Sequence, residues 1–316
     1  MKRKGQKGLV ILGALAGLFL FAGKIHASEL DMGLLNGWRS IGGFTRDLQI
    51  PDKTVSTIYL KRYLVARGEP IKYMNNVFGV EVLNALNNFR IKNNLPTNTG
   101  LDQITRDYIN KDIFREVCPE RNNLDNNFLL PISRVTEVPS DFAPNDLVRL
   151  PKNLVVGNTI HCTTKDTASA LQEMWDAAQK AGISFAVTSS YRSYKLQETL
   201  YNYYKMHNGP NFWRGIAEPG HSEHQLGTTV DIGGLSQNYS GPNDYFNNTK
   251  EGIWLAENSY LYGFIMSYPK DKESMTGYKY EPWHYRYVGK DTAKAIKESN
   301  LTSIEYLKNL QRLATK

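Results

Sequence analysis

The stretch HSEHQLGTTVD, residues 221–231, decides the interpretation of this chain. His224 and Asp231 are seven residues apart, a spacing that corresponds to roughly 23 Å on a straight strand or about 10 Å along a helix. Neither geometry brings both side chains to one metal ion, so the chain must fold back between them. Gly227 permits that bend, and the β-branched residues after it predict a short strand that ends at Asp231.

A second motif, EPWH, occupies residues 281–284. Pro282 interrupts a regular strand because it cannot donate a ladder hydrogen bond, so we expect Glu281 to end a loop and His284 to begin the next strand. Together the two motifs contain three histidines, one aspartate and two glutamates, from which two histidines, the aspartate and one free glutamate can be drawn. That set suits a hydrolytic zinc centre, in which three ligands hold the metal, a fourth position stays open and a free carboxylate moves protons.

We expect one Zn2+ ion to be held by three side chains: His224, Asp231 and His284. Glu281 would stay unligated beside the ion as the catalytic base. Spacing alone leaves alternatives open, because His221 and His224 could form a ligand pair on one helical turn and Glu223 could replace Glu281 as the base. Each of these residues could also be a structural hydrogen-bonding group, and the HExxH signature of many metalloproteases is absent.

A third segment joins a predicted strand to a predicted helix. Residues 183–188 are mostly apolar, which indicates a buried strand, and SSYRSY follows at residues 189–194. A helix is expected from near Ser193, because apolar and aromatic residues then recur on one stripe. Arg192 lies at this strand-to-helix turn, where a guanidinium can bind a carboxylate or an oxyanion bidentately. A surface salt bridge is the alternative.

Four segments together resemble the VanY-type zinc D-alanyl-D-alanine carboxypeptidases. The same family includes peptidoglycan L,D-carboxypeptidases and endopeptidases. The resemblance extends over roughly residues 145–300, and its motifs follow in family order at residues 189–197, 219–231, 262–264 and 276–289. Agreement of four separate motifs is far more specific than a match to any one of them.

The resemblance assigns a role to each matching residue. The Ser-x-His-x-x-Gly-x-x-x-Asp motif supplies two zinc ligands, which fall on His224 and Asp231. The Glu-x-Trp-His motif supplies the catalytic base and the third ligand, which fall on Glu281 and His284. The Tyr-Arg-Ser-Tyr motif supplies the arginine that binds the substrate and the transition state, here Arg192.

The resemblance and the chemistry of donor groups also indicate substrate-binding residues. These candidates are Tyr191, Gln197, Ser222 and Trp283. Trp283 is expected to act as a wall of the pocket. Two positions depart from the family pattern: Thr229 stands where alanine is usual, and Ser267 where arginine is usual. The second departure leaves the fine substrate preference open.

The implied activity is zinc-dependent removal of the C-terminal D-alanine from peptidoglycan stem peptides, a D,D-carboxypeptidase reaction. Two alternatives come from the same family: L,D-carboxypeptidase action on tetrapeptide stems, and endopeptidase action. A non-catalytic cell-wall-binding protein is the alternative from another class. The complete ligand set and the intact Glu281 favour an enzyme.

The first residues predict an exported protein. A basic start is followed by an apolar run at residues 8–23, so residues 1–27 are expected to be a signal peptide or a membrane anchor. The protein would be secreted, or anchored in the cell membrane facing the wall. The formal net charge is +7, and subtracting the five basic residues of this segment leaves +2. The exported part therefore lacks the strong positive charge typical of nucleic-acid binding.

Cys118 and Cys162 could form a disulfide in an exported chain, and would then close a loop of 44 positions. The sequence does not show whether they are oxidised. Neither cysteine lies in a motif, and we expect no cysteine nucleophile.

The predicted fold class is α+β, with two domains. Residues 54–113 are expected to form three helices whose order resembles the small peptidoglycan-binding domain, which would bind the cell-wall polymer. Residues 114–144 read as a connector. Residues 145–316 are expected to form the zinc carboxypeptidase domain, with a small antiparallel sheet flanked by helices.

Overall fold

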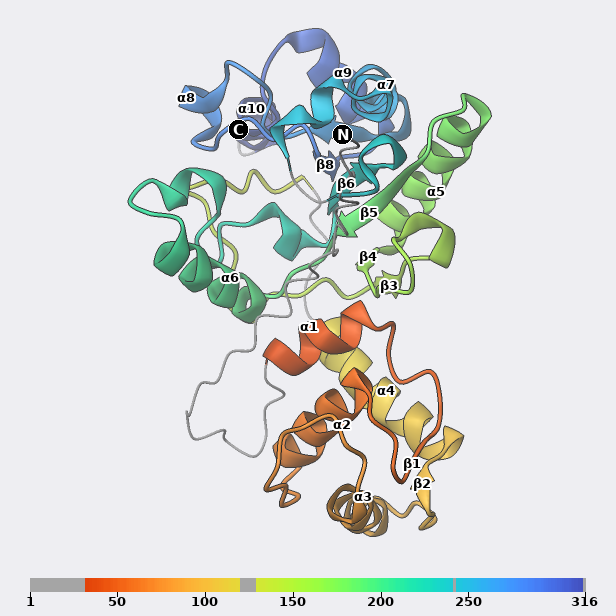
Figure 1. Cartoon of the computed structure of the whole chain (residues 1–316). Helices are drawn as coiled ribbons and strands as arrows, with labels where there is room; N and C mark the ends of the chain where they lie inside the picture. The colour runs from red at the N-terminus through yellow and green to blue at the C-terminus, as the bar shows by residue number, and fades with distance from the viewer. Residues whose placement is uncertain (1–31, 120–128, 241–242, 315–316) are drawn as a thin grey trace, which may run out of the picture.

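The computed structural model describes residues 32–119, 129–240 and 243–314 (Figure 1). The expected signal peptide or anchor, residues 1–27, lies outside these ranges. Within them, no helix combines the length and the apolar character that a membrane crossing requires.

The N-terminal part consists of helices and a two-stranded antiparallel sheet. Its elements are α1 (Met32–Ser40), β1 (Leu48–Gln49), α2 (Val55–Ala66), α3 (Val80–Lys92), β2 (Gly100–Leu101) and α4 (Gln103–Val117). Thr54 and Asp102 are the N-caps of α2 and α4, because each side chain accepts a hydrogen bond from the backbone N–H three residues on. The three helices expected over residues 54–113 are present, α4 continues to Val117, and α1 is an additional helix that the sequence did not predict.

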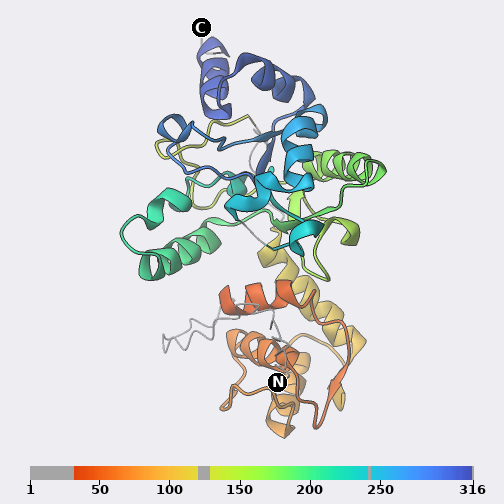
Figure 2. The same cartoon turned by 45° about the horizontal axis from the view of Figure 1, so that its top comes forward.

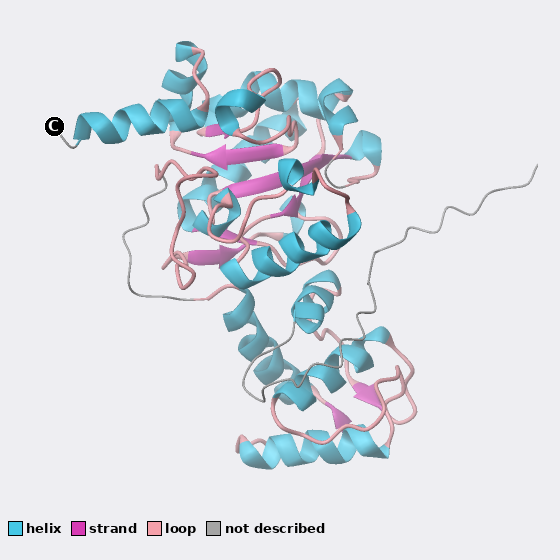
Figure 3. Ribbon diagram, turned by 90° about the vertical axis from the view of Figure 1, so that its left-hand side faces the viewer, coloured by secondary structure: helices cyan, strands magenta, loops and turns pink. Residues whose placement is uncertain are grey.

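The second part is built around a four-stranded antiparallel sheet (Figure 3). The strand order is β5 (Phe185–Ser189), β6 (Thr229–Gly234), β8 (His284–Tyr287) and β7 (Phe264–Met266). Four helices that lie around it are α5 (Lys165–Lys180), α6 (Tyr194–His207), α7 (Lys250–Asn258) and α9 (Lys290–Ser299). The prediction of an α+β fold with a small antiparallel sheet flanked by helices is confirmed.

The remaining elements are short or peripheral. They are β3 (Leu147–Arg149), paired with β4 (Cys162–Thr164), the helices α8 (Glu273–Thr276) and α10 (Ser303–Ala314), and the 3-10 helices η1 (Lys152–Leu154), η2 (Phe212–Gly215), η3 (Glu223–Leu226), η4 (Leu235–Gln237), η5 (Asp244–Asn248) and η6 (Ser259–Tyr262).

The alternation of side chains along β6 and β8 separates the core from the polar face of the sheet. Val230, Ile232 and Tyr285 belong to a buried apolar cluster with residues of α5 and α7. Because successive side chains on a strand point to opposite faces, Asp231 and His284 lie on the other face. These two residues are direct partners in the β6–β8 ladder.

A disulfide joins the two parts of the molecule. Cys118, which follows α4, is bonded to Cys162 in β4, and their Cα atoms are 6.2 Å apart. Both cysteines are buried in an apolar cluster that also contains Leu34 of α1 and Tyr191 of the second part. Figures 1 and 2 show α1 and the end of α4 beside the lower edge of the second part. The pairing that the sequence left open is therefore present.

Candidate active site

His224 lies in a tight turn and not in the sheet. It lies in η3, which is followed by the capping residue Gly227 with a φ of +70°, a left-handed conformation that favours glycine. The Nδ1 atom of His224 donates a hydrogen bond to the carbonyl oxygen of Ser190 over 2.8 Å. This bond orients the ring and leaves Nε2 to face the neighbouring acidic group.

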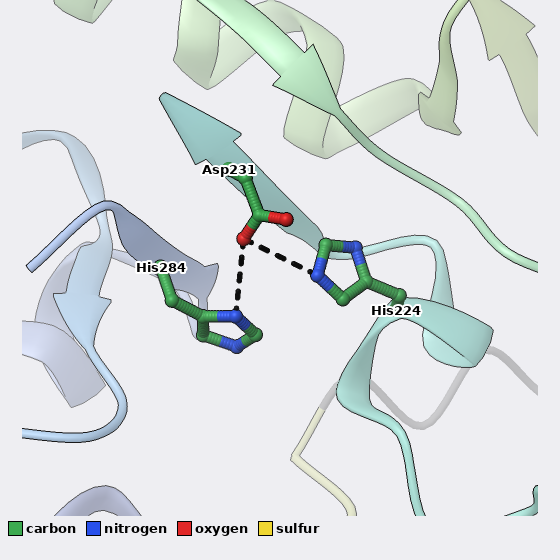
Figure 4. A group of neighbouring side chains, drawn as sticks. All are labelled: His224, Asp231 and His284. Atoms are coloured by element: carbon green, nitrogen blue, oxygen red, sulfur yellow. Dashed lines mark ion pairs between the residues drawn. The ribbon is translucent and has the colours of Figure 1, made fainter. Parts of the chain in front are cut away.

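Asp231 and the two histidines converge on one point (Figure 4). The Oδ1 atom of Asp231 lies 3.4 Å from Nε2 of His224 and 3.2 Å from Nδ1 of His284. One donor atom from each residue lies within 4.8 Å of the others, and all three residues are buried. The chain thus folds back between His224 and Asp231, and both residues lie beside His284.

The donor atoms of this group fit a bound cation. His224 Nε2 and Asp231 Oδ1 are buried, yet neither has a hydrogen-bond partner. Buried polar atoms are normally satisfied, and a metal ion between them would satisfy both. Two imidazole nitrogens and one carboxylate oxygen, with a position left for water, are the ligands of a catalytic zinc site.

Glu281 lies beside the group without belonging to it. Its Oε2 atom is 3.6 Å from Nδ1 of His284, and the side chain is largely buried. Burial raises the pKa of Glu281 to about 7, with the nearby charge of Asp231 adding to the effect and His284 opposing it. A carboxyl group with a pKa near neutrality can both accept and return a proton.

Arg192 approaches the same point from the strand-to-helix turn after β5. Its Nη1 atom lies 3.7 Å from Oδ2 of Asp231. The guanidinium also donates to Ser189 Oγ and to Gln197 Oε1, each over 3.0 Å. These bonds hold the planar group in one orientation, so a cation is fixed beside the acidic residues.

Comparison with known proteins identifies this arrangement. The VanY family model, described as D-alanyl-D-alanine carboxypeptidase, matches residues 161–290. The candidate carboxypeptidase YodJ of Bacillus subtilis (strain 168) is 38% identical over 190 residues, covering 59% of this chain and 69% of YodJ. The chain belongs to the VanY family. It is a zinc metallocarboxypeptidase, with Zn2+ as its cofactor.

Two further relatives show the range of this VanY family. A D-alanyl-D-alanine carboxypeptidase of Enterococcus faecium is 34% identical over 196 residues, which cover 59% of each protein. The solved structure of the LD-carboxypeptidase LdcB is 36% identical, with a TM-score of 0.55, and the match covers 59% of this chain and 92% of LdcB. Both matches leave about two fifths of this chain outside the aligned region.

The VanY-type site opens into a cavity of about 450 Å³. Several of the sequence-predicted residues line this cavity: Arg192, Ser222, His224, Asp231, Glu281, Trp283 and His284. Tyr191 and Gln197 are not among the described residues that line it. Tyr191 is buried in the apolar cluster between the two parts, and Gln197 uses its amide to bind Ala217 O and Arg192. We therefore place Gln197 behind Arg192 rather than against the substrate.

The alternatives that spacing left open do not match the geometry. His221 donates from Nδ1 to the carbonyl oxygen of Ser133 over 2.8 Å, and it is not part of the three-residue group. Glu223 is fully buried behind His284, whereas Glu281 lines the cavity. Glu281 is therefore the better-placed base.

Sequence reasoning missed several residues of the VanY-type cavity. Tyr268 packs against His284, with ring centroids 4.7 Å apart, and Tyr278 packs against Tyr268 at the same centroid distance. The end of α6 and η2 contribute Tyr204, Asn208, Asn211, Phe212 and Arg214. Tyr278 follows Thr276-Gly277 directly, and Tyr268 lies four residues after Phe264, so both tyrosines lie in or near the family motifs and could have been noticed there. The α6 residues carry no motif.

Proposed function

We propose that this protein removes the C-terminal D-alanine from peptidoglycan stem peptides. The observation that supports this most is the convergence of His224, Asp231 and His284 on one buried point, with Glu281 and Arg192 beside it on the wall of one cavity. These five residues are the proposed catalytic centre.

The proposed mechanism assigns the proton transfers to Glu281. When bound by His224, Asp231 and His284, zinc supplies Lewis acidity that makes a water molecule more acidic and a carbonyl group more electrophilic. Glu281 takes a proton from the water molecule while the oxygen of that water attacks the scissile carbonyl carbon. Glu281 then gives that proton to the departing amine, so the C–N bond breaks and free D-alanine leaves.

Arg192 is proposed to stabilise the charge of the transition state. Negative charge develops on the carbonyl oxygen during the attack, and a preoriented donor aimed at that position lowers the barrier. Ser189 and Gln197 hold the guanidinium before substrate arrives, so little reorganisation is needed at the moment of reaction.

Of the two alternative cleavage activities in this family, L,D-carboxypeptidase and endopeptidase, the comparisons favour the first as a second candidate. The structural match to LdcB, an LD-carboxypeptidase, favours trimming of tetrapeptide stems as the second candidate. Purified penta- and tetrapeptide muropeptides, incubated separately with the protein, would separate D,D- from L,D-carboxypeptidase action. We expect D-alanine release from pentapeptide and its loss with a chelator. Release from tetrapeptide alone would assign L,D specificity.

The same proposal places the protein outside the cytoplasm. The basic and apolar start of the chain supports export, and the proposed substrate lies in the cell wall. The helices of the N-terminal part would then bind the wall polymer. Mass spectrometry of the exported protein would show whether residues 1–27 are removed, and sedimentation of the full chain with purified sacculi would test wall binding.

A further inference from the structure

Glu223 links the two histidines of the candidate metal centre without facing the cavity. It precedes His224 in η3, and its Oε2 atom accepts a hydrogen bond from Nε2 of His284 over 3.0 Å. Its other oxygen, Oε1, accepts a bond from Nη1 of Arg286 over 2.9 Å. One carboxylate therefore connects the turn that carries one expected ligand to the strand that carries another.

These contacts lie in the interior of the protein. The side chains of Glu223 and Arg286 are both 0% exposed, so their charges are shielded from water. A buried carboxylate is tolerated only when it is paired and hydrogen-bonded. Arg286 supplies the opposite charge, and its Nη2 atom also donates to Leu130 O over 2.6 Å. The arginine is thus anchored independently of the carboxylate.

The direction of the His284 ring depends on this arrangement. Nδ1 faces Asp231 at 3.2 Å while Nε2 faces Glu223 at 3.0 Å. Rotation of the ring by half a turn would remove both contacts and would take Nδ1 away from Asp231. A metal-binding histidine generally donates its second N–H to a carboxylate or carbonyl, which sets its tautomer and its orientation. His224 has such a partner in the carbonyl of Ser190.

We infer that Glu223 is a positioning residue, which holds the His284 ring so that Nδ1 is presented to the metal, and that Arg286 holds Glu223 in place. This rests on the proposed function, because it takes His284 as a zinc ligand. Glu223 acts through His284 and not on the substrate, since it does not line the cavity.

The test is zinc affinity, measured by competition with a chromophoric chelator, for the full chain and its Glu223→Gln variant. Glutamine keeps the shape of glutamate, but its amide has one oxygen and one NH2 group. It can therefore accept from His284 or from Arg286, and not from both. Zinc affinity is expected to fall about 10- to 100-fold. The zinc concentration for half-maximal D-alanine release should rise by the same factor.

Glu251→Gln is the matched control. Glu251 is also 0% exposed and lies in the same part of the chain, where it accepts hydrogen bonds from Ser236. Its substitution should leave zinc affinity unchanged. Glu223→Asp is a second variant if the glutamine form fails to fold: it keeps the charge for Arg286 but withdraws the oxygen from His284, and should also weaken zinc binding.

Three outcomes would overturn the inference. In the first, the wild-type protein binds zinc and trims peptides, and the folded Glu223→Gln protein binds zinc with the same affinity. This result would refute the positioning role of Glu223 and leave the proposed function intact. In the second, Glu251→Gln loses as much zinc affinity as Glu223→Gln. The loss would then be a general effect of replacing a buried carboxylate by an amide. Failure of the wild-type protein to bind zinc would remove the proposed function as well.

Discussion

Asp231 and His284 are direct partners on adjacent antiparallel strands, and Oδ1 of the aspartate lies 3.2 Å from Nδ1 of the histidine. The ladder of backbone hydrogen bonds between β6 and β8 sets this relationship. A one-residue slip would turn one of the two side chains to the opposite face. The sheet therefore fixes two of the expected ligands, and the turn at Gly227 adds His224.

The base assignment predicts the behaviour of Glu281→Gln. The glutamine side chain has nearly the same shape but cannot accept the proton of the attacking water. We expect zinc content to stay at the wild-type level while turnover falls by about 10²- to 10⁴-fold. Elemental analysis and chromatographic measurement of D-alanine release would check both. Persistent trimming by the variant would rule out Glu281 as the base.

The role of Arg192 predicts that replacing it by lysine lowers kcat, although the positive charge is kept. Lysine keeps the positive charge in Arg192→Lys but lacks the planar fork that Ser189 and Gln197 hold. The expected loss is on the order of 10²-fold in kcat. Gln197→Leu should act in the same direction and more weakly, since it only loosens the guanidinium. Steady-state kinetics on pentapeptide stems would measure both losses. A wild-type kcat in Arg192→Lys would contradict the role of the guanidinium.

The disulfide predicts a large contribution to stability. Cys118 and Cys162 are 44 positions apart, and on the chain-entropy estimate a loop of that length stabilises the folded state by about 4 kcal/mol. The double variant Cys118→Ser, Cys162→Ser should lower the free energy of unfolding by an amount of this order. Denaturant unfolding with and without reductant measures it. Identical unfolding midpoints in both proteins would contradict the expectation.

The lowered pKa of Asp102 predicts that part of the free energy of unfolding depends on pH. Burial opposes ionisation of Asp102, but hydrogen bonds from Thr105 and Asn98 and the charge of Arg90 lower its pKa to about 2, against 3.8 for the free side chain. The folded state therefore favours the ionised form. Water screens this partly exposed side chain, so its contribution is at most about 2 kcal/mol. That contribution is present above pH 4 and is lost as the pH falls through 2.

Asp102→Asn is the comparison that isolates this contribution. Asparagine can still cap α4, but it lacks the charge that pairs with Arg90 Nη2 at 3.2 Å. The wild-type protein should be more stable than the variant at pH 6, and the difference should shrink towards pH 2. A difference that does not change with pH would contradict the assigned shift.

Local patterns in the sequence predicted much of this structure. The bend at Gly227 and the strand that begins at His284 both follow from residues within a few positions of each other. The predicted end of the preceding strand at Asp231 was wrong, because β6 continues to Gly234 and pairs there with β5. The motifs also marked the residues that now line one cavity, because each motif lies where a loop meets a strand.

Contacts between distant residues were not predictable in the same way. Glu223 and Arg286 are 63 positions apart, and they meet only because the β6–β8 register brings their segments together. Tyr191 and Gln197 have suitable donor groups, but spacing does not say that one points into the apolar cluster and the other supports Arg192. Side-chain direction at a turn depends on the packing around it.

Anomalous diffraction at the zinc edge, from crystals of the full chain, would locate the metal ion. We expect one strong peak at about 2.0–2.2 Å from His224 Nε2, Asp231 Oδ1 and His284 Nδ1, with Glu281 outside bonding distance. A peak at other side chains, or crystals grown with zinc that show none at this position, would contradict it.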